Sequence, residues 1–463
     1  MNTSITQNIL STISSLVGKE NLFTSREDAI TYSYDGTPLH SQLPEAIVRP
    51  RTKEQIGELL KLANTEHFSI VPRGAGTGLS GGSIPVPNCI ILDMSQWNTI
   101  LEIDQENLTA WVEPGVITSQ LHEAVEKIGL FYPPDPGSMN ICTIGGNVAE
   151  NSGGLRGLKY GVTKNYVMGL EVVLPSGEII LCGGKAVKDV AGYNLKDLFI
   201  GSEGTLGIFT KILLKLIPKP ETSKTMLAYF NTQADAGRTV SAIISKKIIP
   251  CTVEFLDNTT IRCVEEFAHI GLPTNINSLL LLEVDGHPVV VEDEAAKVVE
   301  CCKQNNATEV ITAQTVEEAM KLKTARRSAF SALARTKPTT ILEDITVPRS
   351  EIATMLEKIA EISKKYNVTI GTFGHAGDGN LHPTCLTDER NHDEIARAEK
   401  AYEEIFIEAV KLGGTITGEH GTGLAKKKFL HLVTGYTAIE TMRTIKKALD
   451  PNNILNPGKV FDV

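Results

Sequence analysis

Hydrophobic and polar positions form short, regular blocks in the first hundred residues. Apolar runs at residues 45–49 and 68–71 predict two strands, and residues 53–64 between them carry apolar side chains at helical spacing. This order predicts a βαβ unit. Its second strand leads directly into a glycine-rich loop at residues 72–82, and another short strand is expected at residues 90–93.

The pattern changes in the next hundred residues, where a second α+β part is expected from about residue 96. Residues 118–128 have helical spacing, and residues 167–182 read as a hairpin around a Pro-Ser-Gly turn. Between them, residues 133–161 are rich in glycine and asparagine and poor in helix formers, so an irregular segment is predicted. An irregular segment of this length inside a domain is usually functional.

Prolines at residues 218–220 mark a predicted domain boundary. Beyond it, strand–helix–strand patterns at residues 225–255 and 279–312 predict a ferredoxin-like α+β domain. A last helix is expected at residues 438–449, followed by a Pro-Gly turn. The predicted division is 1–218 (with a break near residue 95), 219–420 and 421–463.

Composition narrows the class of protein. A chain of 463 residues exceeds one ordinary core, and 41% hydrophobic with 22% charged residues is typical of a globular protein. The net charge of −10 argues against a nucleic-acid partner. We expect no membrane span and no signal peptide, and the eight scattered cysteines lack C-x-x-C spacing, which suits a reducing cytoplasm and argues against an iron–sulfur cluster.

The glycine loop allows three interpretations. Residues 76–81 match the G-x-G-x-x-G string of a nicotinamide-binding Rossmann unit, which requires a helix to begin within the loop. Residues 81–87 hold two glycines and two prolines and cannot start one. A flexible loop is the second interpretation. The third, a cradle of backbone N–H groups for phosphate with Arg73 as a nearby charge, is favoured.

Two histidines and a Glu-His pair stand apart from the other histidines. His375 and His382 lie seven positions apart across a glycine-containing turn, and Glu419-His420 is flanked by glycines. They are either incidental turn residues or a site in which His375, His382 and Glu419 bind a divalent metal with open positions for substrate. The ligand types suit Fe, Zn or Mn alike, and spacing alone does not separate a ligand from a catalytic base.

Several motifs together resemble one known family. They are PRGAGTGLSGG (72–82), PPDPGSMNICTIGGNVAENSGG (133–154), KAVKDVAGYNLKDLFIGSEGTLGI (185–208), FGHAGDGNLH (373–382), GEHGTG (418–423) and NPGKV (456–460). In this order they resemble the FAD-linked oxidases of the vanillyl-alcohol-oxidase type, and within them the branch of D-lactate dehydrogenases and glycolate oxidase D-subunits. The resemblance extends from about residue 20 to the end.

The resemblance implies an α+β fold with a two-part FAD-binding domain at 1–218, a ferredoxin-like substrate or cap domain with a metal site at 219–420, and a C-terminal helical return at 421–463 that closes on the FAD domain. Residues 72–82 contain no histidine, so non-covalent FAD is expected. The implied FAD-binding residues are Pro72, Arg73, Gly74, Ala75, Gly76, Thr77, Gly78, Leu79, Pro136, Gly137, Ser138, Thr143, Gly145, Gly146, Ala149, Asn151, Gly153, Gly154, Glu203, Gly204, Gly207, Ile208 and Asn456.

The resemblance also implies roles in catalysis. His420 is the expected base, and Arg326 is the expected partner of the substrate carboxylate, with Arg327 left open. The implied reaction is oxidation of a small D-2-hydroxy acid, D-lactate favoured, with electrons passed to an external acceptor such as an electron-transferring flavoprotein. Alternatives are a glycolate oxidase-type enzyme, a D-2-hydroxyglutarate dehydrogenase, or an electron-transfer subunit without its own substrate. Relatives that act on dicarboxylates carry a lysine just before a D-x-x-x-P stretch, where this chain has Leu342-Glu343-Asp344, and the absence of that lysine disfavours a long diacid.

Overall fold

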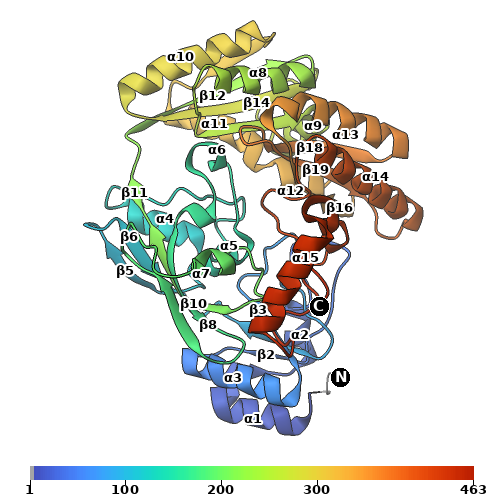
Figure 1. Ribbon diagram of the computed structural model, residues 1–463. Helices are drawn as coiled ribbons and strands as arrows, with labels where there is room; N and C mark the ends of the chain where they lie inside the picture. Colours follow the sequence, from blue (N-terminus) through green and yellow to red (C-terminus); the bar gives the residue numbers. More distant parts are fainter. Residues whose placement is uncertain (1–4) are drawn as a thin grey trace.

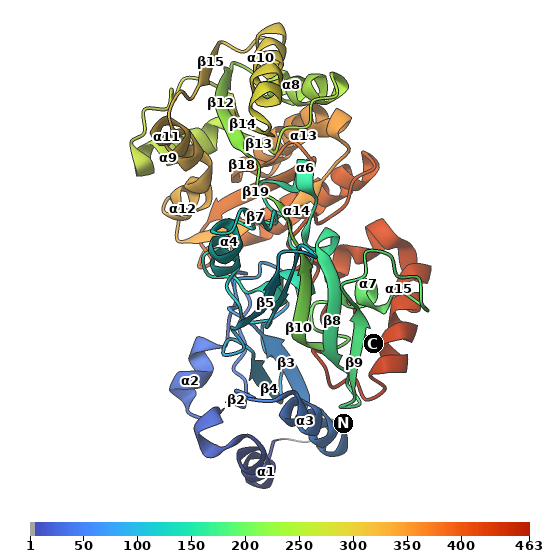
Figure 2. The ribbon, with the colours of Figure 1, turned by 90° about the vertical axis from the view of Figure 1, so that its left-hand side faces the viewer.

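The computed structural model describes residues 5–463. The chain forms two layered bodies stacked along the long axis of the molecule, and the last helix runs back from the upper body along the lower one (Figure 1). The lower body is built by residues up to Pro218 and holds two main sheets. The upper body, called the cap part below, holds one large sheet with helices on its faces (Figures 1 and 2).

The first sheet confirms the predicted βαβ unit. Its order is β1-β2-β4-β3, and β2, β4 and β3 are parallel. Helix α3 begins after Thr52, whose side chain accepts a hydrogen bond from the N–H of Gln55, and buries Ile56, Leu59 and Leu60 on one face. Helix α1 packs against α3 at the base of the molecule. The elements are α1 (Gln7–Val17), β1 (Leu22–Phe23), α2 (Arg26–Thr31), β2 (Ala46–Val48), α3 (Lys53–Glu66), β3 (Ser69–Arg73) and β4 (Cys89–Asp93).

The second sheet is antiparallel, in the order β5-β6-β10-β8-β9. The predicted hairpin forms its β8–β9 edge. Beside it, β7 pairs with β11 in a separate two-stranded ribbon. The elements are β5 (Ile100–Asp104), β6 (Thr109–Val112), α4 (Thr118–Glu126), β7 (Leu130–Phe131), α5 (Ile144–Glu150), α6 (Gly157–Tyr160), β8 (Val167–Val173), β9 (Ile179–Gly183), α7 (Leu195–Phe199), β10 (Ile208–Lys215) and β11 (Ile217–Pro218).

The prediction of an irregular segment at residues 133–161 is wrong in part, because α5 and α6 lie within it. The side chain of Thr143 caps α5 by accepting the N–H of Gly146. Gly145 lets this helix approach a neighbouring loop, since a Cβ there would lie 2.5 Å from Pro114 Cβ. Close packing therefore compensates for the low helix propensity of glycine.

The cap sheet contains the predicted ferredoxin-like unit and extends it. Strands β12 to β15 lie in the order β15-β12-β14-β13, with antiparallel neighbours, and β18, β19 and β16 continue the sheet beyond β13. The elements are β12 (Thr222–Phe230), α8 (Gln233–Ser245), β13 (Thr252–Asp257), α9 (Asn258–Ala268), β14 (Ser278–Gly286), α10 (Pro288–Gln304), β15 (Glu309–Thr312), α11 (Val316–Arg327), α12 (Ala329–Ala334), β16 (Thr339–Leu342), β17 (Ile345–Thr346), α13 (Ile352–Tyr366), β18 (Thr369–His375), β19 (Asn380–Thr387) and α14 (His392–Lys411).

The C-terminal segment returns to the first sheet, as expected. Helix α15 (Leu430–Leu449) is interrupted at Gly435, where φ is +71°. After it, Leu455 forms a parallel bridge with Ile70 on β3, and the N–H of Asn456 donates to the carbonyl of Ile70. The chain end thus joins the strand that leads into the glycine loop (Figure 1).

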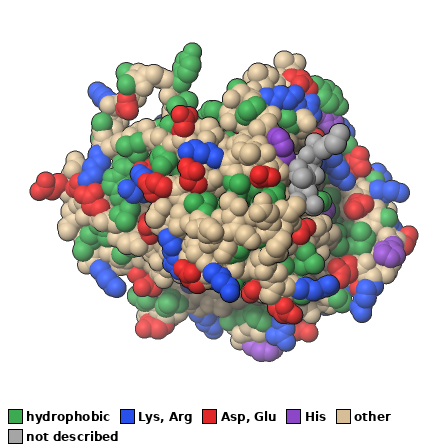
Figure 3. Space-filling model, turned by 90° about the horizontal axis from the view of Figure 1, so that it is seen from below, with side chains coloured by type: hydrophobic (Ala, Val, Ile, Leu, Met, Phe, Trp, Pro, Cys, Tyr) green, Lys and Arg blue, Asp and Glu red, His purple; other side chains and the backbone are tan. Residues whose placement is uncertain are grey.

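The surface matches the mixed composition. Acidic and basic side chains are interspersed over the lower face, without one dominant basic patch (Figure 3). Among residues 5–463, no helix is long and apolar enough to cross a bilayer.

Candidate active site

A cavity of about 730 Å³ lies where the lower body meets the cap part. Its walls come from the glycine loop, the segment after residue 135, the turn before β10, helices α11 and α12, and the hairpin β18–β19. The four chemically distinctive residues His375, His382, Glu419 and His420 also line it. The glycine loop and the histidine–glutamate motifs, about 300 residues apart in sequence, therefore line the same cavity.

The glycine loop is not a Rossmann turn. Strand β3 ends at Arg73, and no helix follows before β4. Gly74 is needed for close approach, because a Cβ there would overlap Thr143 Oγ1, and Gly76 has a φ of +68°. Eight predicted residues of this loop line the cavity: Pro72, Arg73, Gly74, Ala75, Gly76, Thr77, Gly78 and Leu79.

Most other predicted cofactor residues line the same cavity. They are Pro136, Gly137, Ser138, Thr143, Gly145, Gly146, Ala149, Glu203, Gly204, Gly207 and Ile208. Asn151, Gly153, Gly154 and Asn456 do not line it. Asn151 Oδ1 instead accepts the N–H of Lys164. A Cβ on Gly153 would lie 2.6 Å from Glu419 Oε2, and one on Gly154 would lie 2.5 Å from the carbonyl oxygen of Asp135, so both glycines serve packing behind the wall.

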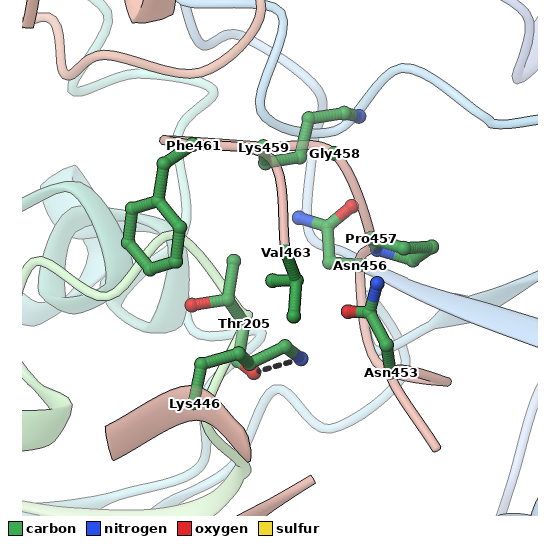
Figure 4. A pocket seen from close by; sticks show the side chains of 9 residues that line it. All are labelled: Thr205, Lys446, Asn453, Asn456, Pro457, Gly458, Lys459, Phe461 and Val463. Carbon is green, nitrogen blue, oxygen red and sulfur yellow. Dashed lines mark hydrogen bonds between the residues drawn. The ribbon is translucent and has the colours of Figure 1, made fainter. Parts of the chain in front are cut away.

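Asn456 supports the cavity from outside. Its side-chain amide donates to the carbonyls of Gly82, at 2.9 Å, and Glu203, at 2.7 Å. It lies in the C-terminal turn together with Lys459 (Figure 4), whose Nζ donates to the carbonyl of Ile84. In the same view Lys446 reaches the carbonyl of Thr205. This turn therefore holds together the two loops that form opposite parts of the wall.

Two neighbouring carboxylates, Glu150 and Glu203, line the cavity, and only Glu203 was predicted from the sequence. Glu203 accepts the N–H groups of Thr422 and Gly423, each at 2.7 Å, and so ties the segment after His420 to the lower body. Burial raises the pKa of Glu203 to about 6. Burial and the neighbouring Glu203 raise the pKa of Glu150.

The hairpin β18–β19 brings the two separated histidines together. His375 pairs with Asn380 across the hairpin and His382 pairs with Phe373, so both imidazoles point to one side, with ring centroids 5.1 Å apart. Glu419 Oε1 lies 2.9 Å from His375 Nε2 and 3.3 Å from His382 Nε2. One ligand atom from each of the three residues lies within 4.8 Å of the others.

The charges in this cluster depend on two carboxylates that flank His375. Burial disfavours the imidazolium form of His375, but Glu254 and Glu419 outweigh burial and hold its pKa well above the usual value. Both histidines in turn hold the pKa of Glu419 well below the usual range despite burial. A divalent cation bound at Nε2 of His375 would displace the proton from that nitrogen, because metal binding requires the neutral imidazole.

Arg326 reaches the same site from α11. Its guanidinium lies over the ring of Phe373, at 4.7 Å from the centroid, and its Nε donates to Glu254 Oε2. Arg327, left open by the sequence, also lines the cavity, but its side chain is exposed. The mostly buried side chain, 11% exposed, and its fixed plane favour Arg326 as the binder of a carboxylate.

His420 is held by a buried carboxylate that the sequence analysis did not identify as functional. Asp344 accepts the backbone N–H groups of Gly418, at 2.6 Å, and Glu419, at 2.8 Å, and its Oδ1 lies 3.4 Å from His420 Nδ1. Lys426, also buried, pairs with Asp344. Burial lowers the pKa of His420 to about 4, so its imidazole is neutral near pH 7.

Comparison with protein families matches both parts of the chain. Residues 44–183 match the model described as "FAD binding domain", and residues 219–460 match "FAD linked oxidases, C-terminal domain". The chain belongs to the FAD-linked oxidase family. It is thus an FAD-binding oxidoreductase, and the family expected from the motifs is confirmed.

Curated relatives cover nearly the whole chain. It is 55% identical over 457 residues to "Glycolate oxidase subunit GlcD" of Bacillus subtilis (strain 168), covering 99% of this chain and 97% of the relative. It is 39% identical to the protein of the same name from Escherichia coli (strain K12), covering 96% and 88%. It is 36% identical to "D-lactate dehydrogenase" of Archaeoglobus fulgidus, covering 93% and 95%.

Solved structures share the fold at low identity. P-cresol methylhydroxylase with substrate bound matches with a TM-score of 0.81 at 20% identity, covering 100% of this chain and 99% of that one. Alkyldihydroxyacetonephosphate synthase matches with a TM-score of 0.77 at 20% identity, covering 99% and 87%. The predicted two-domain fold of the vanillyl-alcohol-oxidase type is therefore confirmed.

Proposed function

We propose that this protein is an FAD- and metal-dependent dehydrogenase that oxidises a short 2-hydroxy acid to the 2-oxo acid. One observation carries the proposal: His375, His382 and Glu419 converge beside His420 and Arg326 on the wall of the cavity that the FAD-binding loops also line. The sequence favoured D-lactate. The names of the relatives support glycolate equally.

We place the cofactors by the chemistry of the walls. The glycine loop and the start of α5 present backbone N–H groups and small residues, which fit an anionic dinucleotide, and without a histidine in residues 72–82 we propose that FAD is non-covalent. Two imidazoles and one carboxylate would hold Fe, Zn or Mn. When bound, the cation supplies Lewis acidity and the flavin supplies the electron acceptor.

The side chains of this protein would then divide the remaining tasks. Neutral His420, with Nδ1 toward Asp344, has Nε2 free to accept the proton of the substrate hydroxyl. Arg326 uses Nε for Glu254, which leaves its terminal N–H groups for the substrate carboxylate.

The alternatives explain less of the site. An electron-transfer subunit without a substrate would not need a buried base, a carboxylate-binding arginine and three convergent ligand atoms. A dicarboxylate such as 2-hydroxyglutarate would place its second carboxylate near an apolar part of the wall, since Leu342 and Phe373 line the cavity. We therefore propose a monocarboxylate substrate. The proposed domain division is the one predicted from the sequence, and the eight free cysteines support a cytoplasmic location.

The proposal predicts that the FAD-loaded protein is bleached anaerobically by D-lactate, by glycolate or by both, and not by the L-2-hydroxy acids. Removal of the metal with a chelator should abolish bleaching, because the cation and Arg326 together orient the substrate. Flavin absorbance near its visible maximum is the measurement. Acid precipitation should release all the flavin into the supernatant. Bleaching that persists after complete metal removal would contradict the metal assignment.

Replacement of His420 by asparagine should lower kcat by about 10²- to 10⁴-fold, the usual contribution of a positioned base. FAD content and metal content should stay at wild-type levels. His67→Asn is the matched control, because His67 is exposed at the end of α3 in a left-handed conformation that asparagine adopts readily. Steady-state kinetics with D-lactate and glycolate measure the effect. A variant with wild-type kcat would remove His420 from the mechanism.

We further propose that the electrons leave to an electron-transferring flavoprotein or another redox subunit, because the GlcD relatives are named as subunits. Stopped-flow reoxidation of the substrate-reduced protein should be slow with oxygen and become fast when such a flavoprotein is added. Rapid reoxidation by oxygen that the flavoprotein does not accelerate would overturn this assignment. Quinone linked through partner subunits is the remaining alternative and is tested in the same way with a soluble quinone.

A further inference from the structure

Glu254 contacts two parts of the candidate site that have different tasks. It lies on β13 and is fully buried. Its Oε1 is 2.7 Å from His375 Nδ1, and its Oε2 accepts from Arg326 Nε. One carboxylate thus joins a candidate metal ligand to the candidate binder of the substrate carboxylate. None of the sequence motifs includes Glu254.

We propose that Glu254 is a positioning residue that sets the spacing between the metal and the guanidinium of Arg326, and thereby fits the site to a short 2-hydroxy acid. This inference rests on the proposed function. Such an acid must reach the metal with its hydroxyl and carboxylate while the same carboxylate reaches Arg326. Only a narrow range of separations between the two cations allows this.

Glu254 orients the imidazole of His375. A carboxylate that accepts the Nδ1 proton fixes the tautomer, so that Nε2 carries the lone pair, and it also fixes the plane of the ring. In this structure Nε2 of His375 faces Glu419 Oε1 at 2.9 Å. Glu254 therefore directs the ligand atom of His375 toward the other two ligands.

Glu254 also orients the guanidinium of Arg326. The bond from Nε to Glu254 and the stacking on Phe373 fix the plane of the guanidinium. Strand β13, which carries Glu254, pairs with β18 at Phe255–Gly374 and Leu256–Phe373, directly before His375. The hydrogen bonds between these two strands therefore hold the separation of Glu254 and His375. Glu254 in turn holds the guanidinium of Arg326, which comes from α11, against this pair.

The chain offers a matched control on the neighbouring strand. Glu283 of β14 pairs with Lys323, which is also on α11, at 2.6 Å. This ion pair fastens the same helix to the same sheet but contacts neither a histidine of the cluster nor Arg326. Removing the Glu283–Lys323 ion pair therefore shows how much Mn²⁺ affinity and KM change when α11 is attached less firmly but the site is left intact.

The test compares Glu254→Gln, Glu254→Asp and Glu283→Gln as FAD-loaded proteins depleted of metal. Mn²⁺ affinity is measured by titration, and KM and kcat are measured for D-lactate and glycolate. Glu254→Gln should weaken Mn²⁺ binding by about 10- to 100-fold, the usual effect of losing an outer partner of a ligand histidine, and should raise KM more than it lowers kcat. Glu254→Asp keeps the charge and should recover part of the Mn²⁺ affinity. Glu283→Gln should match the wild type in Mn²⁺ affinity and KM.

Wild-type Mn²⁺ affinity and KM in Glu254→Gln would overturn the inference. Equal losses in Glu283→Gln would also overturn it, because they would show that α11 docking alone matters. If Glu254→Gln does not yield FAD-loaded protein, Glu254→Asp replaces it in the comparison, and wild-type Mn²⁺ affinity and KM in that variant would overturn the inference. A wild-type protein that neither binds Mn²⁺ nor is bleached by any 2-hydroxy acid would instead refute the proposed function, before any variant is compared.

Discussion

The position of the Glu419 carboxylate between two buried imidazoles is the interaction on which the rest of the candidate site depends. His375 and His382 belong to the cap sheet, and Glu419 lies between them. The turn that carries Glu419 is bound to the lower body, because the N–H groups of Thr422 and Gly423 donate to Glu203. Glu419 also packs against Gly153, in the segment that the family motif assigns to the flavin. The cluster therefore lies at the junction of the two bodies, and a substrate bound there must face the FAD-binding walls.

Buried charges make this junction rigid. Glu254 meets His375 and Arg326, and Asp344 meets Lys426 and the turn that carries His420. Breaking such a buried pair by removing one partner typically costs about 3–5 kcal/mol, because the other charge stays in a medium that solvates it poorly. Each pair holds a catalytic candidate in one geometry, which is the arrangement that pre-organised catalysis requires.

Sequence reasoning succeeded where local signals are strong. The proline-broken glycine loop excluded a Rossmann helix. The glycine-containing turn predicted between His375 and His382 is the turn of the β18–β19 hairpin. It failed where the signal is long-range. Glu254 lies in a strand with the sequence TVEFLD, in which polar and apolar residues alternate as in a strand with one face in solvent. Only the structure shows that both faces of this strand are covered and that Glu254 is buried. Helix α5 was missed because Gly145 is required there by close contact with Pro114, whereas glycine has a low intrinsic helix propensity. The role of Asn456 in joining the Gly82 and Glu203 loops is equally long-range and has no signal in the sequence.

The central claim is that a metal ion occupies the histidine–glutamate cluster beside the flavin. Anomalous diffraction from crystals of the active, FAD-loaded enzyme, collected at the absorption edge of its metal, tests this directly. The account predicts one peak at about 2.0–2.2 Å from Nε2 of His375, Nε2 of His382 and a carboxylate oxygen of Glu419. A fully active crystal with no peak there, or with its metal bound elsewhere, would contradict it.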